Sequence, residues 1–167
     1  MCWHLTVAVP PAAVSEVPSL FAVAGGGSPE PDAAVAAAVG RGNPCFAVGA
    51  GCACSLYRAT ASDADRIRRK AARGGWSAVK LARALAGADD WSGLAPVARE
   101  AVSAVAERWG RAAVFLYWAG RGGAVSVPQP AIVSSSAFRS AGVGEGQLVV
   151  VDAESAAAVD PPRTPGR

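Results

Sequence analysis

The sequence predicts a single α/β domain, an α+β sandwich in which a mixed sheet of four or five strands packs with three or four helices. Alternating apolar residues at 3–9 predict a half-buried strand, and the unbroken apolar run at 112–120 predicts a central strand. Helical patterns that begin at a serine and end at a glycine lie between and after these strands, an order typical of layered α/β folds. A chain of 167 residues is long enough to bury one such core.

Three further strands are predicted. The stretch CFAVGAGCACSLY at 45–57 has strand composition with glycine interruptions, 124–128 follows the central strand as a hairpin partner, and QLVVV at 147–151 is the last strand. Because a helical connection separates 3–9 from 45–57, crossover rules lead us to expect these two strands to be parallel.

Helices are predicted at 62–73, 77–86, 92–110 and 134–142. Ser62 followed by Asp65 has the spacing of a capping box, and Gly74 and Gly75 end the first of these helices. The domain is expected to span 1–152, and the Ala- and Pro-rich segment 153–167 is expected to be disordered.

Composition restricts the class of protein. The chain is 51% hydrophobic and 17% charged, with a net charge of +3, which is typical of a globular protein. No apolar run of 18 residues predicts a membrane span, and no segment resembles a signal peptide. Arginine outnumbers lysine fourteen to two, a bias that indicates GC-rich codon usage. We therefore expect a cytoplasmic bacterial protein whose four cysteines are thiols or metal ligands rather than disulfides.

The pair Cys52 and Cys54 is the most prominent local feature. On a strand at 45–57 the two side chains project from the same apolar face, where free cysteine packs as a small hydrophobic residue. This interpretation makes the pair part of the core, and no cofactor is then expected.

Two alternatives give the cysteines a chemical role. Cys2, His4, Cys52 and Cys54 together are a ligand set that zinc accepts in tetrahedral geometry, although structural zinc sites usually separate paired ligands by two to four residues. Parallel strands would also place Cys2 roughly 20 Å from Cys52. In the other alternative, Cys52 and Cys54 form a strained, easily reduced disulfide that takes part in thiol exchange.

Catalytic patterns are scarce. The start Met1-Cys2 resembles that of class II glutamine amidotransferases, which implies a nucleophilic Cys2 with its own amine as base, but Trp3 stands where glycine normally follows. The chain has a single histidine and no P-loop, H-E-x-x-H or G-x-S-x-G pattern. The sequence favours a protein without catalytic activity.

A basic helix pair at 62–86 is the other candidate site. Residues 58–83 hold eight cations and two acids, and one helix side carries a stripe of four: Arg66, Arg69, Lys70 and Arg73. The pair resembles a helix-turn-helix in outline, but the second helix, which would read the DNA groove, has only Lys80 and Arg83. Nucleic acid is therefore not the partner that we expect first.

The function predicted from the sequence is that of a small non-catalytic binding or interaction protein. Its partner would be a protein or a small ligand rather than a membrane. The basic helices and the strand end at Tyr117 and Trp118 are its candidate surfaces. The alternatives are a thiol-based metal-binding or redox protein centred on Cys52 and Cys54, and a nucleic-acid-binding protein that uses 62–86.

Overall fold

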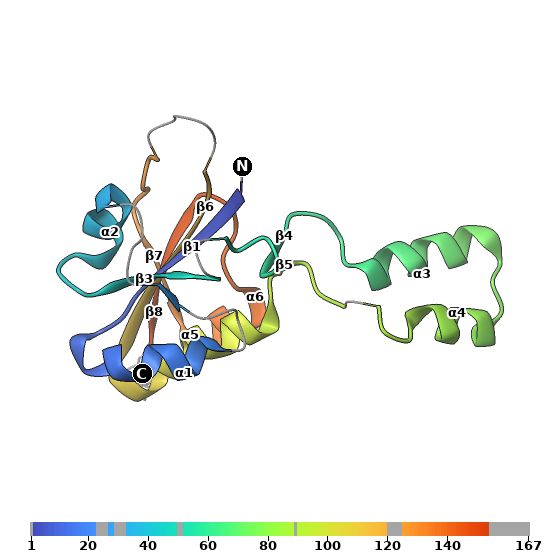
Figure 1. Cartoon of the computed structure of the whole chain (residues 1–167). Coiled ribbons are helices and arrows are strands. Elements are labelled where there is room, and N and C mark those ends of the chain that lie inside the picture. The colour runs from blue at the N-terminus through green and yellow to red at the C-terminus, as the bar shows by residue number, and fades with distance from the viewer. Residues whose placement is uncertain are drawn as a thin grey trace, which may run out of the picture.

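The computed structural model describes residues 2–22, 27–28, 33–49, 52–88, 90–119 and 125–153. It shows a mixed β-sheet with helices on both faces, and a helical hairpin that extends from this body (Figure 1). The predicted α+β architecture is thereby confirmed. Apart from residue 153, the predicted disordered segment 153–167 lies outside the described residues.

The main sheet has the strand order β2-β3-β1-β6-β8-β7. Neighbouring strands are antiparallel except β7 and β8, which are parallel, so the sheet is mixed as predicted. Because β2 has only two residues, five strands form nearly all of the sheet. The strands are β1 (Cys2–Ala8), β2 (Gly27–Ser28), β3 (Cys45–Val48), β6 (Arg111–Ala119), β7 (Ala131–Ser134) and β8 (Gln147–Asp152).

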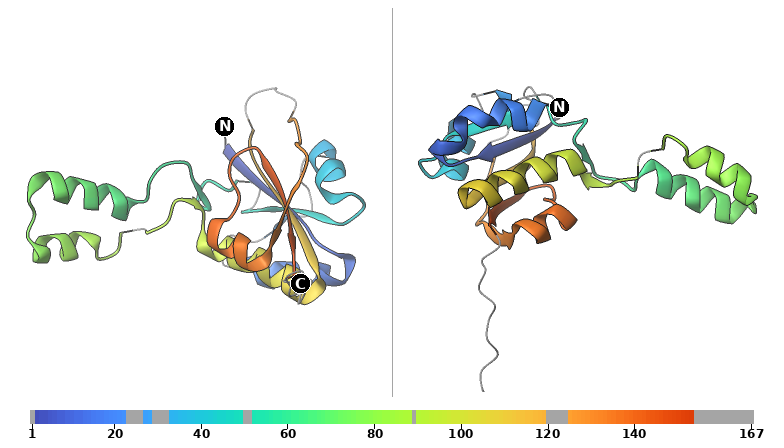
Figure 2. Two further views of the ribbon diagram at one scale, coloured as in Figure 1. Left: turned by 180° about the vertical axis from the view of Figure 1, so that it is seen from behind. Right: turned by 90° about the horizontal axis from the view of Figure 1, so that it is seen from below.

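Helices cover the two faces of the sheet unequally. One face packs against α1, α5 and α6, and the other packs against α2 (Figure 2). The helical elements in the described part of the chain are the 3-10 helix η1 (Pro11–Glu16), α1 (Val17–Phe21), α2 (Ala33–Gly40), α3 (Asp63–Gly74), α4 (Ala78–Leu85), α5 (Pro96–Trp109) and α6 (Ser135–Ala141). The four helices expected from the sequence form as α3 to α6.

The hydrophobic core is divided between the two faces by strand alternation. Leu5 and Leu116 point into the larger cluster beneath α1 and α5, whereas Phe115 and Tyr117 point into the smaller cluster beneath α2. Since β6 is covered on both faces, its apolar run is buried without alternation, as expected of a central strand.

Three expectations about the strands are wrong. The segment 45–57 is not one strand, because the chain turns at Gly49 and, among the described residues of this segment, only Cys45–Val48 and the start of Tyr57–Arg58 pair with other strands. β1 and β3 are antiparallel, because the connection between them places α1 on one face and α2 on the other instead of forming one crossover helix. The hairpin strand predicted at 124–128 is not formed by its described residues 125–128. Instead, β7 begins after them and pairs with β8.

The basic helix pair projects from the body on a short ribbon formed by β4 (Tyr57–Arg58) and β5 (Gly93–Leu94) (Figures 1 and 2). We call residues 63–85, which comprise α3, α4 and their connection, the arm. Ser62 caps α3 by accepting a hydrogen bond from the Asp65 amide, and Gly75 ends it in the left-handed conformation. The arm contributes no side chain to the two hydrophobic clusters of the body.

No helix in the described ranges has both the length and the apolar character needed to cross a bilayer.

Replacing Leu116 with alanine tests the assignment of β6 as the centre of the core. Leu116 is 0% exposed, so Leu116→Ala should lower the free energy of unfolding by about 2–5 kcal/mol, measured by urea denaturation. The control is Ile132→Ala on the edge strand β7, where the side chain is 68% exposed and the change should be below about 0.5 kcal/mol. Equal effects of the two substitutions would contradict this assignment.

Candidate metal centre

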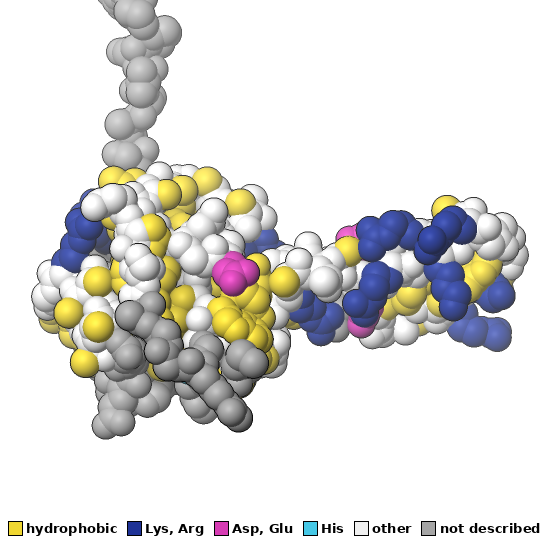
Figure 3. Space-filling model, turned by 90° about the horizontal axis from the view of Figure 1, so that it is seen from above, with side chains coloured by type: hydrophobic (Ala, Val, Ile, Leu, Met, Phe, Trp, Pro, Cys, Tyr) yellow, Lys and Arg dark blue, Asp and Glu magenta, His cyan; other side chains and the backbone are white. Residues whose placement is uncertain are grey.

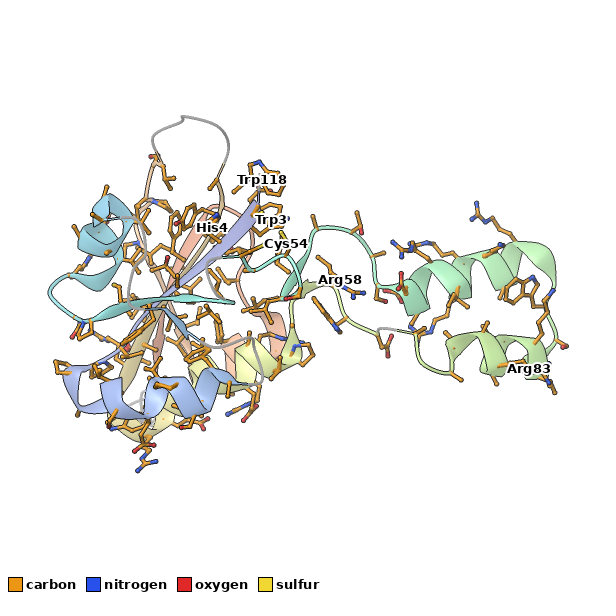
Figure 4. The ribbon with its side chains drawn as sticks, in the orientation of Figure 1. Trp3, His4, Cys54, Arg58, Arg83 and Trp118 are labelled. Carbon is orange, nitrogen blue, oxygen red and sulfur yellow. The ribbon has the colours of Figure 1, made fainter. Side chains whose placement is uncertain are left out.

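Three of the four cysteines come together at one end of β1. The Sγ atoms of Cys2, Cys52 and Cys54 all lie within 4.8 Å of one another. We call these three residues the cysteine triad. Within the described residues, no other group of three or more histidine, cysteine or acidic side chains is close enough to hold a metal ion. Figure 4 shows Cys54 beside Trp3, at the base of the ribbon that carries the arm.

Antiparallel pairing of β1 and β3 brings the triad together. Leu5 pairs with Val48 at the end of this ladder, so the chain that follows β3 runs back alongside the start of β1. There the Ala53 amide donates a hydrogen bond of 2.7 Å to the Trp3 carbonyl. Parallel strands would have separated Cys2 from Cys52, and the structure therefore removes the geometric objection to a shared site.

The turn at Gly49 decides which side chain enters the core. The Cys52 amide donates to the Gly49 carbonyl at 3.0 Å, and Gly49 has a φ of +79°. After this turn Ala53 is 0% exposed and packs in the larger core cluster, while Cys52 is half-buried and Cys54 is exposed. Interpreting both cysteines as core residues is therefore wrong, because Ala53 takes the inward position and its two neighbours project to the other side.

The thiols of the triad influence one another's protonation. Hydrogen bonds with Cys52 and then with Cys54 raise the pKa of Cys2. The pKa of Cys52 is lowered, first by the backbone N–H of Cys54 and then by the thiols of Cys54 and Cys2. Of these two thiols, Cys52 therefore becomes a thiolate at the lower pH.

His4 and Cys45 do not belong to this cluster. The His4 ring stacks on the Tyr117 ring at a centroid distance of 5.4 Å, and His4 is absent from the group of close ligand atoms. Cys45 pairs with Ala8 at the opposite end of β1, where its thiol donates to the Ala36 carbonyl at 3.5 Å and burial raises its pKa. Of the four ligands considered from the sequence, the structure thus unites three.

Aromatic rings lie along the strand that carries Cys2. The Trp3 ring lies between Tyr57 and Trp118, at centroid distances of 4.6 and 4.8 Å. Trp118 is 42% exposed, whereas Tyr117 is buried between His4 and Phe115. Of the two residues predicted to form a surface at this strand end, only Trp118 is therefore exposed. The contact of Tyr57 with Trp3 was not predicted from the sequence, although Tyr57 lies only three residues after Cys54 on the same segment.

The six basic residues of the candidate surface lie on the arm and not at the triad. All six are exposed: Arg66, Arg69, Lys70, Arg73, Lys80 and Arg83. Figure 4 shows Arg83 on the arm, far from Cys54. The protein thus has two separate candidate sites.

Comparison of the chain with protein-family models, with curated proteins and with solved structures found no significant match.

Replacing Gly49 with alanine tests the turn that orients the triad. An added Cβ would lie 2.5 Å from the Cys52 carbonyl oxygen, so Gly49→Ala must displace the Cys52 backbone. The matched control is Gly42→Ala, because Gly42 also has a positive φ (+92°) but has no atom within 4 Å of the added Cβ. Gly49→Ala should lower the free energy of unfolding by about 1–3 kcal/mol more than the control. Equal losses in thermal or urea unfolding would show that the turn is not constrained in this way.

Proposed function

We propose that the protein binds one soft metal ion through the thiolates of Cys2, Cys52 and Cys54. The observation that supports this proposal is the approach of three sulfur atoms to within 4.8 Å of one another, from two segments about fifty residues apart in the sequence. Three thiols that merely fill a core would be buried, whereas these are half-buried or exposed. The ligand set is smaller than the four-residue set considered from the sequence, because it lacks His4.

The spacing of the sulfur atoms is close to what a shared ion requires. A zinc–sulfur bond of about 2.3 Å places tetrahedral ligands about 3.8 Å apart, and a trigonal site places them about 4.0 Å apart. Side-chain shifts of about 1 Å or less bring sulfur atoms within 4.8 Å to either arrangement. The exposure of Cys54 allows such a shift without repacking the core.

The chemistry of the donors limits the kind of ion. Thiolates are soft ligands that favour Zn²⁺ and Cu⁺ over Mg²⁺ or Ca²⁺. Within the described residues no histidine, aspartate or glutamate joins the triad, so a tetrahedral ion would take its fourth ligand from solvent or from another molecule. The large hydrophobic core does not include the triad cysteines, and the fold therefore does not depend on the ion. These features suit reversible binding of a metal better than a closed structural site.

A dithiol redox function is the second candidate, and the opposite pKa shifts of the Cys2 and Cys52 thiols favour it. The pKa of Cys52 is lowered and that of Cys2 is raised, so Cys52 loses its proton more readily than its neighbour Cys2. In the reaction, the Cys52 thiolate attacks one sulfur of a disulfide such as oxidised glutathione, forms a mixed disulfide with that half and releases the other half as a thiolate. Cys2 then gives its proton to that thiolate and attacks the Cys52 sulfur, which completes an internal disulfide and releases the second glutathione as a thiolate.

Serine substitutions test the metal site and separate it from the redox alternative. The protein should bind one zinc ion, and Cys2→Ser, Cys52→Ser and Cys54→Ser should each weaken binding by about 100-fold or more in competition with a chromophoric chelator. Cys45→Ser is the matched control and should leave the affinity unchanged, because Cys45 lies at the other end of β1.

The result for Cys54 distinguishes the two functions. A metal site needs all three thiols, whereas a disulfide between Cys2 and Cys52 still forms in Cys54→Ser. If that variant retains reversible oxidation by glutathione while the parent protein binds no zinc, the metal proposal fails and the redox candidate replaces it.

Zinc binding should also depend steeply on pH. Because the pKa of Cys2 is raised, its thiol is protonated at neutral pH and must lose its proton to become a ligand. We expect release of about two to three protons per ion, with apparent affinity rising as pH increases from 6 to 8. Calorimetry in buffers of different ionisation enthalpy measures the release. Binding without proton release would exclude thiolate ligands.

A further inference from the structure

The arm has a charge unlike that of the rest of the molecule. Between residues 66 and 88 the chain has seven cations and no acid. Figure 3 shows Lys and Arg side chains gathered along the arm, whereas the visible face of the body is mainly hydrophobic or uncharged. Because the ribbon β4–β5 holds the arm away from the body, its positive surface is accessible along its length (Figure 2).

Ion pairs neutralise only the base of the arm. Arg66 pairs with Asp63, and Arg68 pairs with Asp65 and with Asp90 at 3.0 and 2.9 Å. Five cations farther along the arm have no acidic partner within 4 Å among the described residues: Arg69, Lys70, Arg73, Lys80 and Arg83. The distal part of the arm is thus a concentrated positive surface.

The number of unpaired cations on the arm is similar to the number of phosphates on one DNA strand over the same length. At 1.5 Å per residue, α3 is about 18 Å long, and each strand of B-DNA carries about five phosphates over that length of the axis. A protein partner that docks on a helix normally needs apolar anchors on the exposed face. Among the large apolar side chains of the arm only Val79, 72% exposed, is strongly exposed.

The arrangement of the arm differs from the helix-turn-helix expected from the sequence. In a helix-turn-helix the second helix would have to read the bases, and α4 has few cations for that role. Instead, α3 and α4 lie side by side as an antiparallel hairpin in both views (Figures 1 and 2), and the cation stripe is on α3. Contacts to phosphates do not require a recognition helix in the groove, and they provide most of the affinity in sequence-independent binding.

Double-stranded DNA fits the arm better than a single strand does. Single-strand binding uses aromatic rings on which bases stack, and the arm has one aromatic residue, Trp76. The ammonium of Lys80 lies over the Trp76 ring, 4.4 Å from its centroid, so that face is occupied. An α-helix fits the major groove of B-DNA, whereas the corresponding groove of duplex RNA is too narrow.

We infer that the arm binds double-stranded DNA through its phosphates, without sequence preference. Arg69, Lys70 and Arg73 on α3 supply the main contacts, and Lys80 and Arg83 on α4 add to the positive surface. This inference is independent of the metal site.

The experiment measures binding of the full chain to a labelled duplex of about 25 base pairs by fluorescence anisotropy at several salt concentrations. With three to five phosphates contacted, the slope of log K against log salt should be about −3 to −4.5, a loss of about 60- to 500-fold between 50 and 200 mM salt. The triple variant Arg69→Gln/Lys70→Gln/Arg73→Gln should reduce this slope by about 2 to 3 units. Glutamine favours helix, so the variant should retain its circular dichroism spectrum.

The matched control removes the same charge from the body. Arg41→Gln/Arg108→Gln/Arg111→Gln should bind the duplex like the parent protein, and so should Cys54→Ser, which separates this test from that of the metal site. The inference is overturned if no binding occurs at 50 mM salt or if both triple variants lose affinity equally. Tighter binding of single-stranded DNA, duplex RNA or polyglutamate than of the duplex would also overturn it.

Discussion

The hydrogen bond from the Ala53 amide to the Trp3 carbonyl, 2.7 Å long, fixes the arrangement on which the rest of the site depends. It holds the loop after β3 against the start of β1, and it can form only because these strands are antiparallel. With Ala53 directed into the core, Cys52 and Cys54 project towards Cys2. A backbone contact between two uncharged residues thus assembles a cluster of thiols from distant parts of the sequence.

The same loop connects the two candidate sites. Two residues after Cys54 comes Leu56, which is buried and whose carbonyl accepts a hydrogen bond of 2.7 Å from the Ala95 amide. The ribbon that carries the arm begins at the next residue, Tyr57, whose ring packs against Trp3. Anchoring both ends of the ribbon in the core lets the arm extend into solvent while the body keeps its packing. An ion at the triad and a polyanion on the arm would therefore occupy separate surfaces of one continuous segment of the chain.

Local patterns in the sequence predicted the elements whose residues interact with near neighbours. Serine caps at Ser62 and Ser77 and the glycine after α3 identified the arm, and the apolar run of β6 identified the central strand. The relative direction of β1 and β3 depends on how the connection between them crosses the sheet. Local sequence patterns do not reveal the path of that connection. The break at Gly49 was visible as a glycine interruption, but its effect on side-chain direction requires knowledge of φ. For this reason the cysteines were predicted to lie in the core, and the geometric argument against their approach to Cys2 was wrong.

X-ray absorption spectroscopy of the zinc-loaded protein is the sharpest test of metal binding by the triad, because it counts the sulfur atoms bound to the ion. If the triad holds the ion, the spectrum should show three sulfur ligands at about 2.3 Å together with one lighter ligand from solvent. Because the triad is the only group of suitable ligands among the described residues, no other arrangement of them yields that count. A coordination sphere made only of nitrogen and oxygen atoms, or one with fewer than three sulfur atoms, would contradict binding of the ion by the whole triad.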